Sequence, residues 1–255
     1  DILQMKPKNL MKENMKHFSD YRRKISLLLI LLLSLSISSE TVSSPQFLLE
    51  ETIESLKKVK SLKANIKRFQ FYNGETRISE GKVAFNDSMV VYNYTSPGKF
   101  RMIFTGREMQ SFDLEKKLGR RESLSGECLL RESDPLGRFL WLRDKAAGEY
   151  KFKGSLDSGM VFVRCSEEGL TEYIGVNRES SMPSVIEWFD TTGAMIEQTS
   201  FNYRAGSIIP LSIVTRSMPG SILIDSMVIS HPKINTELPG GEIEVPQGIR
   251  WDQER

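Results

Sequence analysis

The fold is decided by an alternating stretch that reads LKANIKRFQF over residues 62–71. Apolar side chains occupy every second position from Leu62 to Ile66, which is the period expected of a β-strand with one buried face. The apolar positions then change parity, because Phe69 and Phe71 follow at odd numbers. This change predicts a phase slip or β-bulge within the strand.

A helix is predicted immediately before this stretch. Pro45 suits its first turn, and Glu50 and Glu51 lie in the early turns, where the helix dipole favours acidic groups. One apolar stripe at helical spacing consists of Leu48, Leu49, Thr52, Ile53, Leu56 and Val59.

The remainder of the chain has the pattern of a large β-structure. Asn73-Gly74 is a strong hairpin signal, and Asp134-Pro135 begins a second, short helical pattern. Strands are predicted at 82–85, 89–94, 99–105, 108–114, 150–152, 160–165, 171–176, 184–189, 194–203, 208–216, 221–230 and 242–245. We therefore expect an α+β fold that is mostly β, with a large antiparallel sheet curled into an incomplete barrel.

The N-terminal part resembles a secretory leader. Ile25 to Ile37 is an apolar run of about 13 residues that follows Arg22-Arg23-Lys24 and ends at small polar residues. The run is short for a membrane-spanning helix. We expect residues 1–38 to be a leader with a cleavable signal peptide and residues 39–255 to be a single domain. The alternative is an uncleaved N-terminal anchor.

The charge of the chain argues against a nucleic-acid partner. The whole sequence has 35 basic and 33 acidic side chains, and the excess of positive charge lies in the leader. The remainder is nearly neutral, so no polyanion partner is expected. A basic cluster at Lys116-Lys117 and Arg120-Arg121 is interpreted as a solvated strand edge. Its alternative is a docking patch for an acidic partner or for lipid headgroups.

Groups that could perform chemistry are sparse. Neither His17 nor His231 belongs to a catalytic or metal-binding pattern, and no nucleophile elbow, phosphate loop or dinucleotide fingerprint is present. We therefore expect no enzymatic activity, metal or cofactor. Cys128 and Cys165 either form one disulfide in an oxidising compartment or remain two buried thiols.

Apolar side chains at alternating positions are what this sequence has in quantity. A curled sheet with a large apolar face must cover that face. Helices can either fill the interior as an ordinary core or lie across it as a lid over a cavity. Periodicity alone favours the ordinary core.

Six local patterns, in their order and spacing, resemble the LolA family of periplasmic lipoprotein carriers. They lie at Leu56 to Arg68, Glu80-Gly81, Ser96-Pro97 through Leu124, Asp134-Pro135-Leu136 with Phe139-Leu140, Asp190 to Gly193, and Val245 to Ile249. The resemblance implies a half-barrel closed by helices over an apolar cavity. That cavity would shelter the acyl chains of a lipoprotein travelling from the inner to the outer membrane.

The alternating apolar positions and this resemblance together indicate a set of binding residues. The expected cavity residues are Ile66, Phe69, Phe71, Val83, Phe85, Phe100, Met102, Phe104, Ile186 and Trp188, and the expected lid residues are Leu136, Phe139 and Leu140. The implied partners are lipoproteins or lipid acyl chains, an inner-membrane release complex and an outer-membrane acceptor, with the carrier itself a periplasmic monomer. The alternative is a non-carrier envelope protein of the same fold, acting as a lipid-binding or stress-sensing interaction module.

Overall fold

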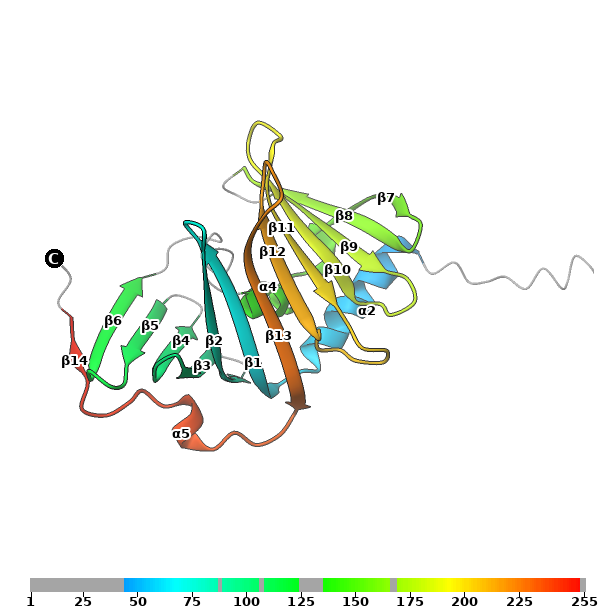
Figure 1. Cartoon of the computed structure of the whole chain (residues 1–255). Coiled ribbons are helices and arrows are strands. Elements are labelled where there is room, and N and C mark those ends of the chain that lie inside the picture. Colours follow the sequence, from blue (N-terminus) through cyan, green and yellow to red (C-terminus); the bar gives the residue numbers. More distant parts are fainter. Residues whose placement is uncertain (1–43, 87–88, 106–107, 124–134, 166–168, 253–255) are drawn as a thin grey trace, which may run out of the picture. The chain divides into compact units, whose positions relative to one another are not determined.

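The alternating stretch forms β1 (Ser61–Tyr72), a strand near the middle of a large sheet. The computed structural model describes residues 44–86, 89–105, 108–123, 135–165 and 169–252. Within these residues the sheet has 14 strands in the order β14-β6-β5-β4-β3-β2-β1-β13-β12-β11-β10-β9-β8-β7, and it is not closed (Figure 1). The mostly β prediction is confirmed.

Two runs of consecutive strands flank the centre of the sheet. The first run is β2 (Glu75–Asn86), β3 (Met89–Ser96), β4 (Phe100–Thr105), β5 (Glu108–Asp113) and β6 (Leu118–Ser123). The second is β7 (Lys151–Leu156), β8 (Gly159–Cys165), β9 (Thr171–Asn177), β10 (Pro183–Phe189), β11 (Met195–Asn202), β12 (Ser212–Ser217) and β13 (Ile222–Ile234). These strands pair antiparallel, as predicted, but β14 (Arg250–Trp251) runs parallel to β6. The sheet is therefore mixed.

The predicted slip within β1 is wrong. All 12 residues of β1 pair with β2 in continuous register, so one face carries Leu62, Ala64, Ile66 and also Arg68. The irregularity lies instead in the neighbouring strand β13, opposite Lys63–Asn65, where His231 has a φ of 52°. Arg68 takes the inward position that an apolar residue would normally occupy. Phe69 and Phe71 therefore lie on the opposite face of the sheet from Ile66.

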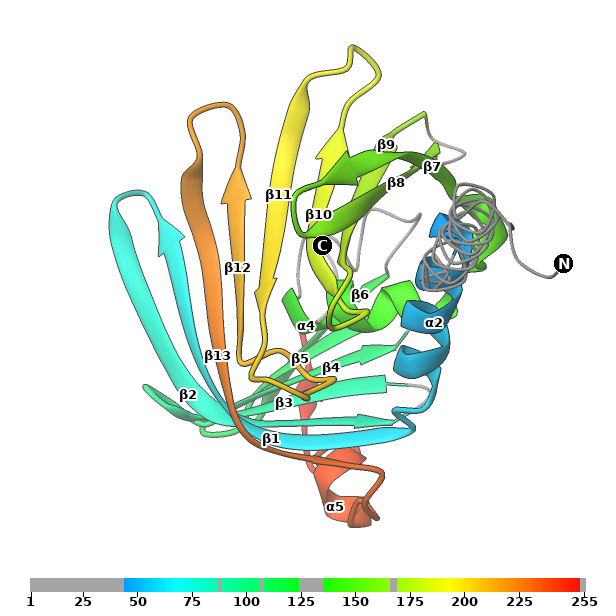
Figure 2. The same ribbon diagram turned by 90° about the vertical axis from the view of Figure 1, so that its right-hand side faces the viewer.

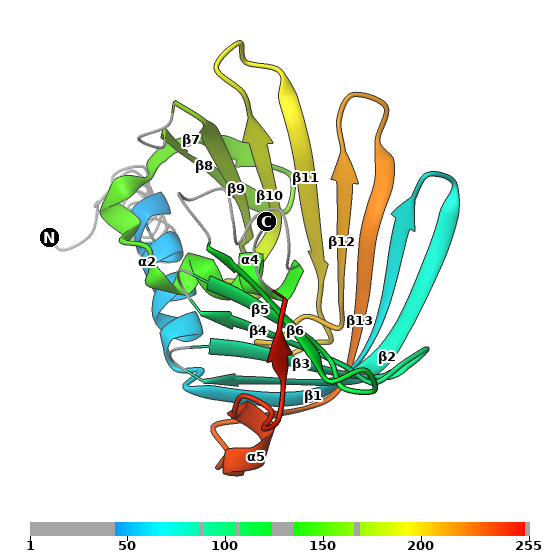
Figure 3. The ribbon, with the colours of Figure 1, turned by 90° about the vertical axis from the view of Figure 1, so that its left-hand side faces the viewer.

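Helices α2 and α4 lie on the concave side of the bent sheet (Figures 2 and 3). Helix α2 (Pro45–Lys57) begins at Ser44, whose Oγ accepts a hydrogen bond from the Phe47 N–H, and it buries the predicted apolar stripe. Helix α4 (Pro135–Trp141) is followed by two 3-10 turns, η1 (Leu142–Asp144) and η2 (Ala147–Glu149). Both predicted helices are present, and they cover the apolar layer of the sheet.

The end of the chain covers part of the other face. The strand predicted at 242–245 is wrong, because Gly240–Ile243 forms the short helix α5. Arg101 holds this turn by donating hydrogen bonds to the carbonyl oxygens of Gly241 (3.1 Å) and Glu244 (2.6 Å). The apolar side chains in this second, smaller core are Val91, Ile103, Phe112, Met89, Leu114, Ile243 and Ile249.

One glycine in the centre of the sheet is required by close packing. A Cβ atom at Gly81 would overlap the carbonyl oxygen of Asn93 and lie 2.7 Å from the Tyr94 Cα. We expect Gly81→Ala to lower the free energy of unfolding by about 1–3 kcal/mol, because backbone atoms must move. Gly154→Ala is the matched control, since a Cβ there has nothing within 4 Å. Equal stabilities of the two variants in urea denaturation would contradict this account.

Candidate ligand-binding interior

The inward face of the sheet presents a continuous apolar layer. Most of the predicted cavity residues belong to it and are buried in one hydrophobic core, namely Ile66, Val83, Phe85, Phe104, Ile186 and Trp188. Phe100 and Met102 lie at its margin, where they are partly buried against the same core. The structure thus brings these eight residues together, from strands on both sides of the sheet centre.

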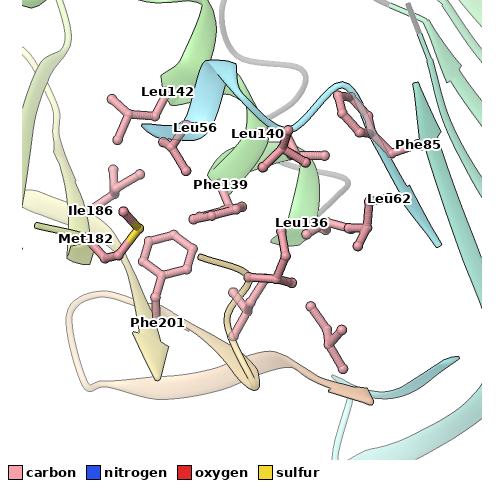
Figure 4. Close-up of a cluster of buried hydrophobic side chains, with 14 of the residues drawn as sticks. Leu56, Leu62, Phe85, Leu136, Phe139, Leu140, Leu142, Met182, Ile186 and Phe201 are labelled. Atoms are coloured by element: carbon pink, nitrogen blue, oxygen red, sulfur yellow. The ribbon is translucent and has the colours of Figure 1, made fainter. Parts of the chain in front are cut away.

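Helix α4 fills the space above this layer. The predicted lid residues Leu136, Phe139 and Leu140 are 0%, 0% and 5% exposed. The Phe139 ring lies 5.7 Å from that of Phe201 on β11, and Figure 4 shows the labelled side chains of α4 among those of the sheet and α2. In this structure, therefore, α4 and its apolar side chains occupy the region that the sequence analysis predicted to be a cavity.

Two predicted cavity residues lie elsewhere. Phe69 and Phe71 are on the outward face of β1, where Phe69 pairs with Ile78, a residue that is 45% exposed. The Lys67 Nζ lies 5.7 Å from the centre of the Phe69 ring on this outer face. Neither phenylalanine belongs to the apolar layer under α4, because β1 has no slip that would turn them inward.

A polar anchor attaches α4 to the sheet. Arg138, which is 6% exposed, donates hydrogen bonds from Nη1 to the Oγ1 atoms of Thr199 and Thr215, both at 3.0 Å. Its Nη2 donates to Glu197 Oε2 at 3.1 Å. Sequence reasoning missed this residue, although a lone arginine between Leu136 and Phe139 in an otherwise apolar helical run is the signal that could have identified it.

A second buried polar cluster lies on β8 and β9. Glu172 is fully buried and accepts hydrogen bonds on Oε2 from the Tyr150 hydroxyl (2.9 Å) and from Arg164 Nε (3.1 Å). Burial raises the pKa of Glu172 to about 7, and the charge of Arg164 and the two hydrogen bonds offset this only in part. The carboxyl group is therefore protonated over much of the acidic range.

A small pocket opens beside β1–β4, at the margin of the apolar layer. Its volume is about 170 Å³, and its lining includes Arg68, Arg77, Tyr94, Lys99, Phe100 and Met102. Arg68 donates from Nε to Asp225 Oδ2 at 2.9 Å and from Nη1 to the Tyr94 hydroxyl at 3.4 Å. Burial opposes the charge of Arg68, but Tyr94 and Asp225 outweigh it and raise the pKa of this group further.

The basic cluster on β5 and β6 is largely neutralised. Lys116 pairs with Asp113, Arg120 with Glu122, and Arg121 with Glu108. Arg121 also stacks over the ring of Trp251, which lies on β14, with its Cζ atom 4.6 Å from the ring centre. These ion pairs fit a solvated surface, but β14 pairs with the first two residues of β6, so β6 is not a free edge there.

The remaining sequence predictions concern cysteines, metals and the leader. Cys165 is exposed at the end of β8, so the alternative of two buried thiols is wrong for this residue. Cys128 lies outside the described residues, so the disulfide stays a prediction. The leader, Ile25 to Ile37 included, also lies outside them. Across the part of the chain that the structure describes, no group of three or more acidic, histidine or cysteine side chains could hold a metal ion. In the same part, no helix is long and apolar enough to cross a membrane.

No protein family model and no curated protein sequence matches this chain. Solved structures match it in fold. A LolA superfamily protein from Nitrosomonas europaea has a TM-score of 0.55 at 16% identity, over 79% of this chain and 97% of its own. A domain assigned to outer membrane lipoprotein sorting from Vibrio parahaemolyticus has a TM-score of 0.55 at 11% identity, over 76% and 94%. A DUF1329 family protein from Desulfovibrio piger has a TM-score of 0.60 at 10% identity, over 80% and 97%.

These likenesses define the class of fold. At such low identities they concern the fold alone, and that fold is LolA-like. The resemblance seen in the sequence is thus confirmed at the level of architecture, with nearly the whole of each solved chain covered.

The buried carboxyl group of Glu172 predicts a pH dependence of stability. The pKa of the Glu172 carboxyl group is about 7 in the folded state, whereas that of an unperturbed glutamate is 4.5. The contribution of Glu172 to the free energy of unfolding is therefore fully present below pH 4.5 and is lost as the pH rises to 7. Between pH 5 and 8 the free energy of unfolding should fall by about 2–3 kcal/mol more in the wild type than in Glu172→Gln.

Urea denaturation at both pH values measures this difference. Glu179→Gln, which removes an exposed carboxylate from the turn after β9, is the matched control and should behave as the wild type. The assignment to Glu172 fails if Glu172→Gln shows the full wild-type pH dependence.

Proposed function

We propose that this protein is a periplasmic carrier that binds the acyl chains of lipoproteins against the concave face of its sheet. The LolA-like fold supports this proposal, since one solved structure of this fold is assigned to lipoprotein sorting. The observation on which it mainly rests is the mode of attachment of α4. This helix covers the apolar layer with three large side chains but is fastened to the sheet through the polar Arg138.

The α4 side chains and an acyl chain would gain comparable free energy by covering the apolar layer. Burying Leu136, Phe139 and Leu140 contributes roughly 1.5–3 kcal/mol per side chain. An acyl chain contributes about 0.8 kcal/mol per buried methylene. About ten methylenes, fewer than an ordinary acyl chain holds, therefore replace what α4 loses when it leaves. A helix of 7 residues has little stability of its own, so its position depends on these contacts.

The polar anchor makes the closed position specific. A buried ion pair adds little net stability compared with apolar packing of the same volume, but removing one partner leaves a buried charge. Arg138 and Glu197 thus favour one placement of α4 without adding to the apolar surface that a ligand must displace. Binding would move α4 aside, and release would restore the anchor.

The remaining features of the proposal come from the sequence and from the family resemblance. Export by the leader at residues 1–38 would place residues 39–255 in the periplasm as a monomer. An inner-membrane release complex would supply the lipoprotein, and an outer-membrane acceptor would receive it. No catalytic step is part of this cycle.

The packed interior favours a second candidate, a non-carrier envelope module of the same fold. Its supporting observation is that α4 fills the apolar layer, while the pocket beside β1–β4 measures only about 170 Å³. Ligand sites are typically about 300–1,000 Å³. A module of this kind would bind a protein partner and no lipid.

Ligand binding distinguishes the two candidates. The carrier should bind a dansylated undecanoic acid with enhanced, blue-shifted fluorescence. Native mass spectrometry of protein purified from a host with intact membranes should also detect bound lipid. If neither is observed, the carrier proposal is wrong.

Loosening α4 tests the mechanism of opening. In Arg138→Gln the anchor is weakened, and the free energy of unfolding should fall by about 3 kcal/mol. Because a larger fraction of molecules is then open, the affinity for the dansylated probe should rise. Hydrogen exchange in residues 135–141 should accelerate in parallel.

Arg164→Gln is the matched control for this variant. Arg164 is also a buried arginine paired with a glutamate, but it lies on β8 and does not touch the anchor of α4. It should lose stability without gaining affinity. Equal affinity changes in the two variants would show that general destabilisation, rather than the position of α4, controls binding.

A further inference from the structure

We propose that the pocket beside β1–β4 binds the anionic headgroup of an acyl-chain amphiphile, with Arg77 and Lys99 as the recognising cations. This inference rests on the proposed function and deepens it, because it names the chemical class of the ligand. The pocket combines charged groups at its rim with an apolar wall that adjoins the main core.

Arg77 and Lys99, the two cations at the rim of the pocket, are free to bind an anion. Within the described residues, neither the Arg77 guanidinium nor the Lys99 ammonium has an ion pair or a side-chain hydrogen bond, and both residues are exposed. Other cations nearby do have partners, since Lys67 pairs with Glu80 and Lys116 with Asp113. Arg77 and Lys99 are distinguished from other surface cations of this sheet by lining the pocket.

The acidic groups of the pocket leave a surplus of positive charge. Asp113 accepts hydrogen bonds from the backbone N–H groups of Glu115 and Lys116 and forms an ion pair with the Lys116 side chain. Arg68 is likewise neutralised by Asp225. Glu115 remains as the acid opposed to Arg77 and Lys99, so the pocket favours one negative charge on its ligand.

The wall of the pocket suits a hydrocarbon chain. Phe100 and Met102 are partly buried and pack against the main core, and both line the pocket. The Tyr94 ring is buried and stacks on Tyr92 with centroids 5.9 Å apart. A chain whose head lies at the rim would thus run along Phe100 and Met102 towards the apolar layer. Methionine side chains adapt well to variable chains.

The position of Arg77 fits a headgroup. A wider hollow of about 610 Å³ adjoins the pocket over the β1–β2 hairpin, and Gln70 and Arg77 line both spaces. Arg77 thus lies where the narrow pocket meets a broader space, which is also lined by Tyr72, Glu75 and Thr76. A compact anion fits at this junction, and either a carboxylate or a phosphate has the required charge-assisted hydrogen-bonding groups.

Displacement of an uncharged probe tests the inference. The full chain is loaded with N-phenylnaphthylamine, and dodecanoate, dodecyl phosphate and dodecan-1-ol compete with it below their micelle concentrations. We expect the anions to displace the probe about fivefold more effectively than the alcohol, as two exposed cations allow. This preference should shrink at 0.5 M salt. The better of the two anions identifies the source as a fatty acid or a phosphate-bearing lipid.

Variants of Arg77 and Lys99 test whether these two cations cause the preference for anionic competitors. The double variant Arg77→Ala/Lys99→Ala should bind all three competitors equally, whereas Arg77→Lys/Lys99→Arg should retain the preference. Lys151→Ala/Lys153→Ala removes two exposed cations from the edge strand β7 and should behave as the wild type. Thermal unfolding confirms that each variant is folded.

The outcomes separate this inference from the proposed function. Probe displacement without preference for anions overturns the headgroup site and leaves the carrier intact. A preference that survives in Arg77→Ala/Lys99→Ala, or is lost in Lys151→Ala/Lys153→Ala, also overturns it. If the protein binds neither the probe nor any competitor, both the site and the carrier are wrong.

Discussion

The structure depends on the need to cover one large apolar face of an open sheet. Strands β1 to β5 and β8 to β13 turn apolar side chains towards the concave side, and many of these are fully buried. Neither edge of the sheet closes on the other, so strand pairing alone cannot remove this face from water. Helices α2 and α4 and the turns that follow α4 supply the cover. Their stripes of leucine, isoleucine and phenylalanine are therefore as necessary to the fold as the strands.

Polar groups on the same face fix the positions of the covering helices and turns but add little to their stability. Arg138 joins α4 to β11 and β12, and Arg143 donates to the Val59 carbonyl oxygen at 3.0 Å, which joins η1 to the end of α2. Buried charges cost desolvation energy, so each is retained only with partners. The result is an apolar layer whose covering elements have defined positions but are held partly by exchangeable hydrogen bonds.

Sequence periodicity predicted the parts of this structure that depend on local burial. The α2 stripe, most strands and the inward position of residues such as Phe104 follow from spacing alone. The slip predicted within β1 was wrong because Arg68 points inward; its partner Asp225 lies 157 residues away, and no local pattern shows that a buried charge is paired. The same holds for Arg138 with Glu197. Helix α5 and the parallel strand β14 depend on Arg101 and on packing against Phe112, which are equally non-local.

In the proposed cycle, either the apolar face of α4 or a hydrocarbon chain covers the apolar layer, and the two differ in their polar ends. The polar group of helix α4 at this layer is Arg138, whose hydrogen-bond acceptors lie on β11 and β12. The polar headgroup of an amphiphile would lie on the opposite side of the sheet centre, beside Arg77 on β2 and Lys99 before β4. The two polar sites do not share a residue. A ligand can therefore engage the rim while α4 is still anchored, and hydrocarbon can then replace the helix side chains stepwise. Such an order avoids exposing the whole apolar layer to water at once.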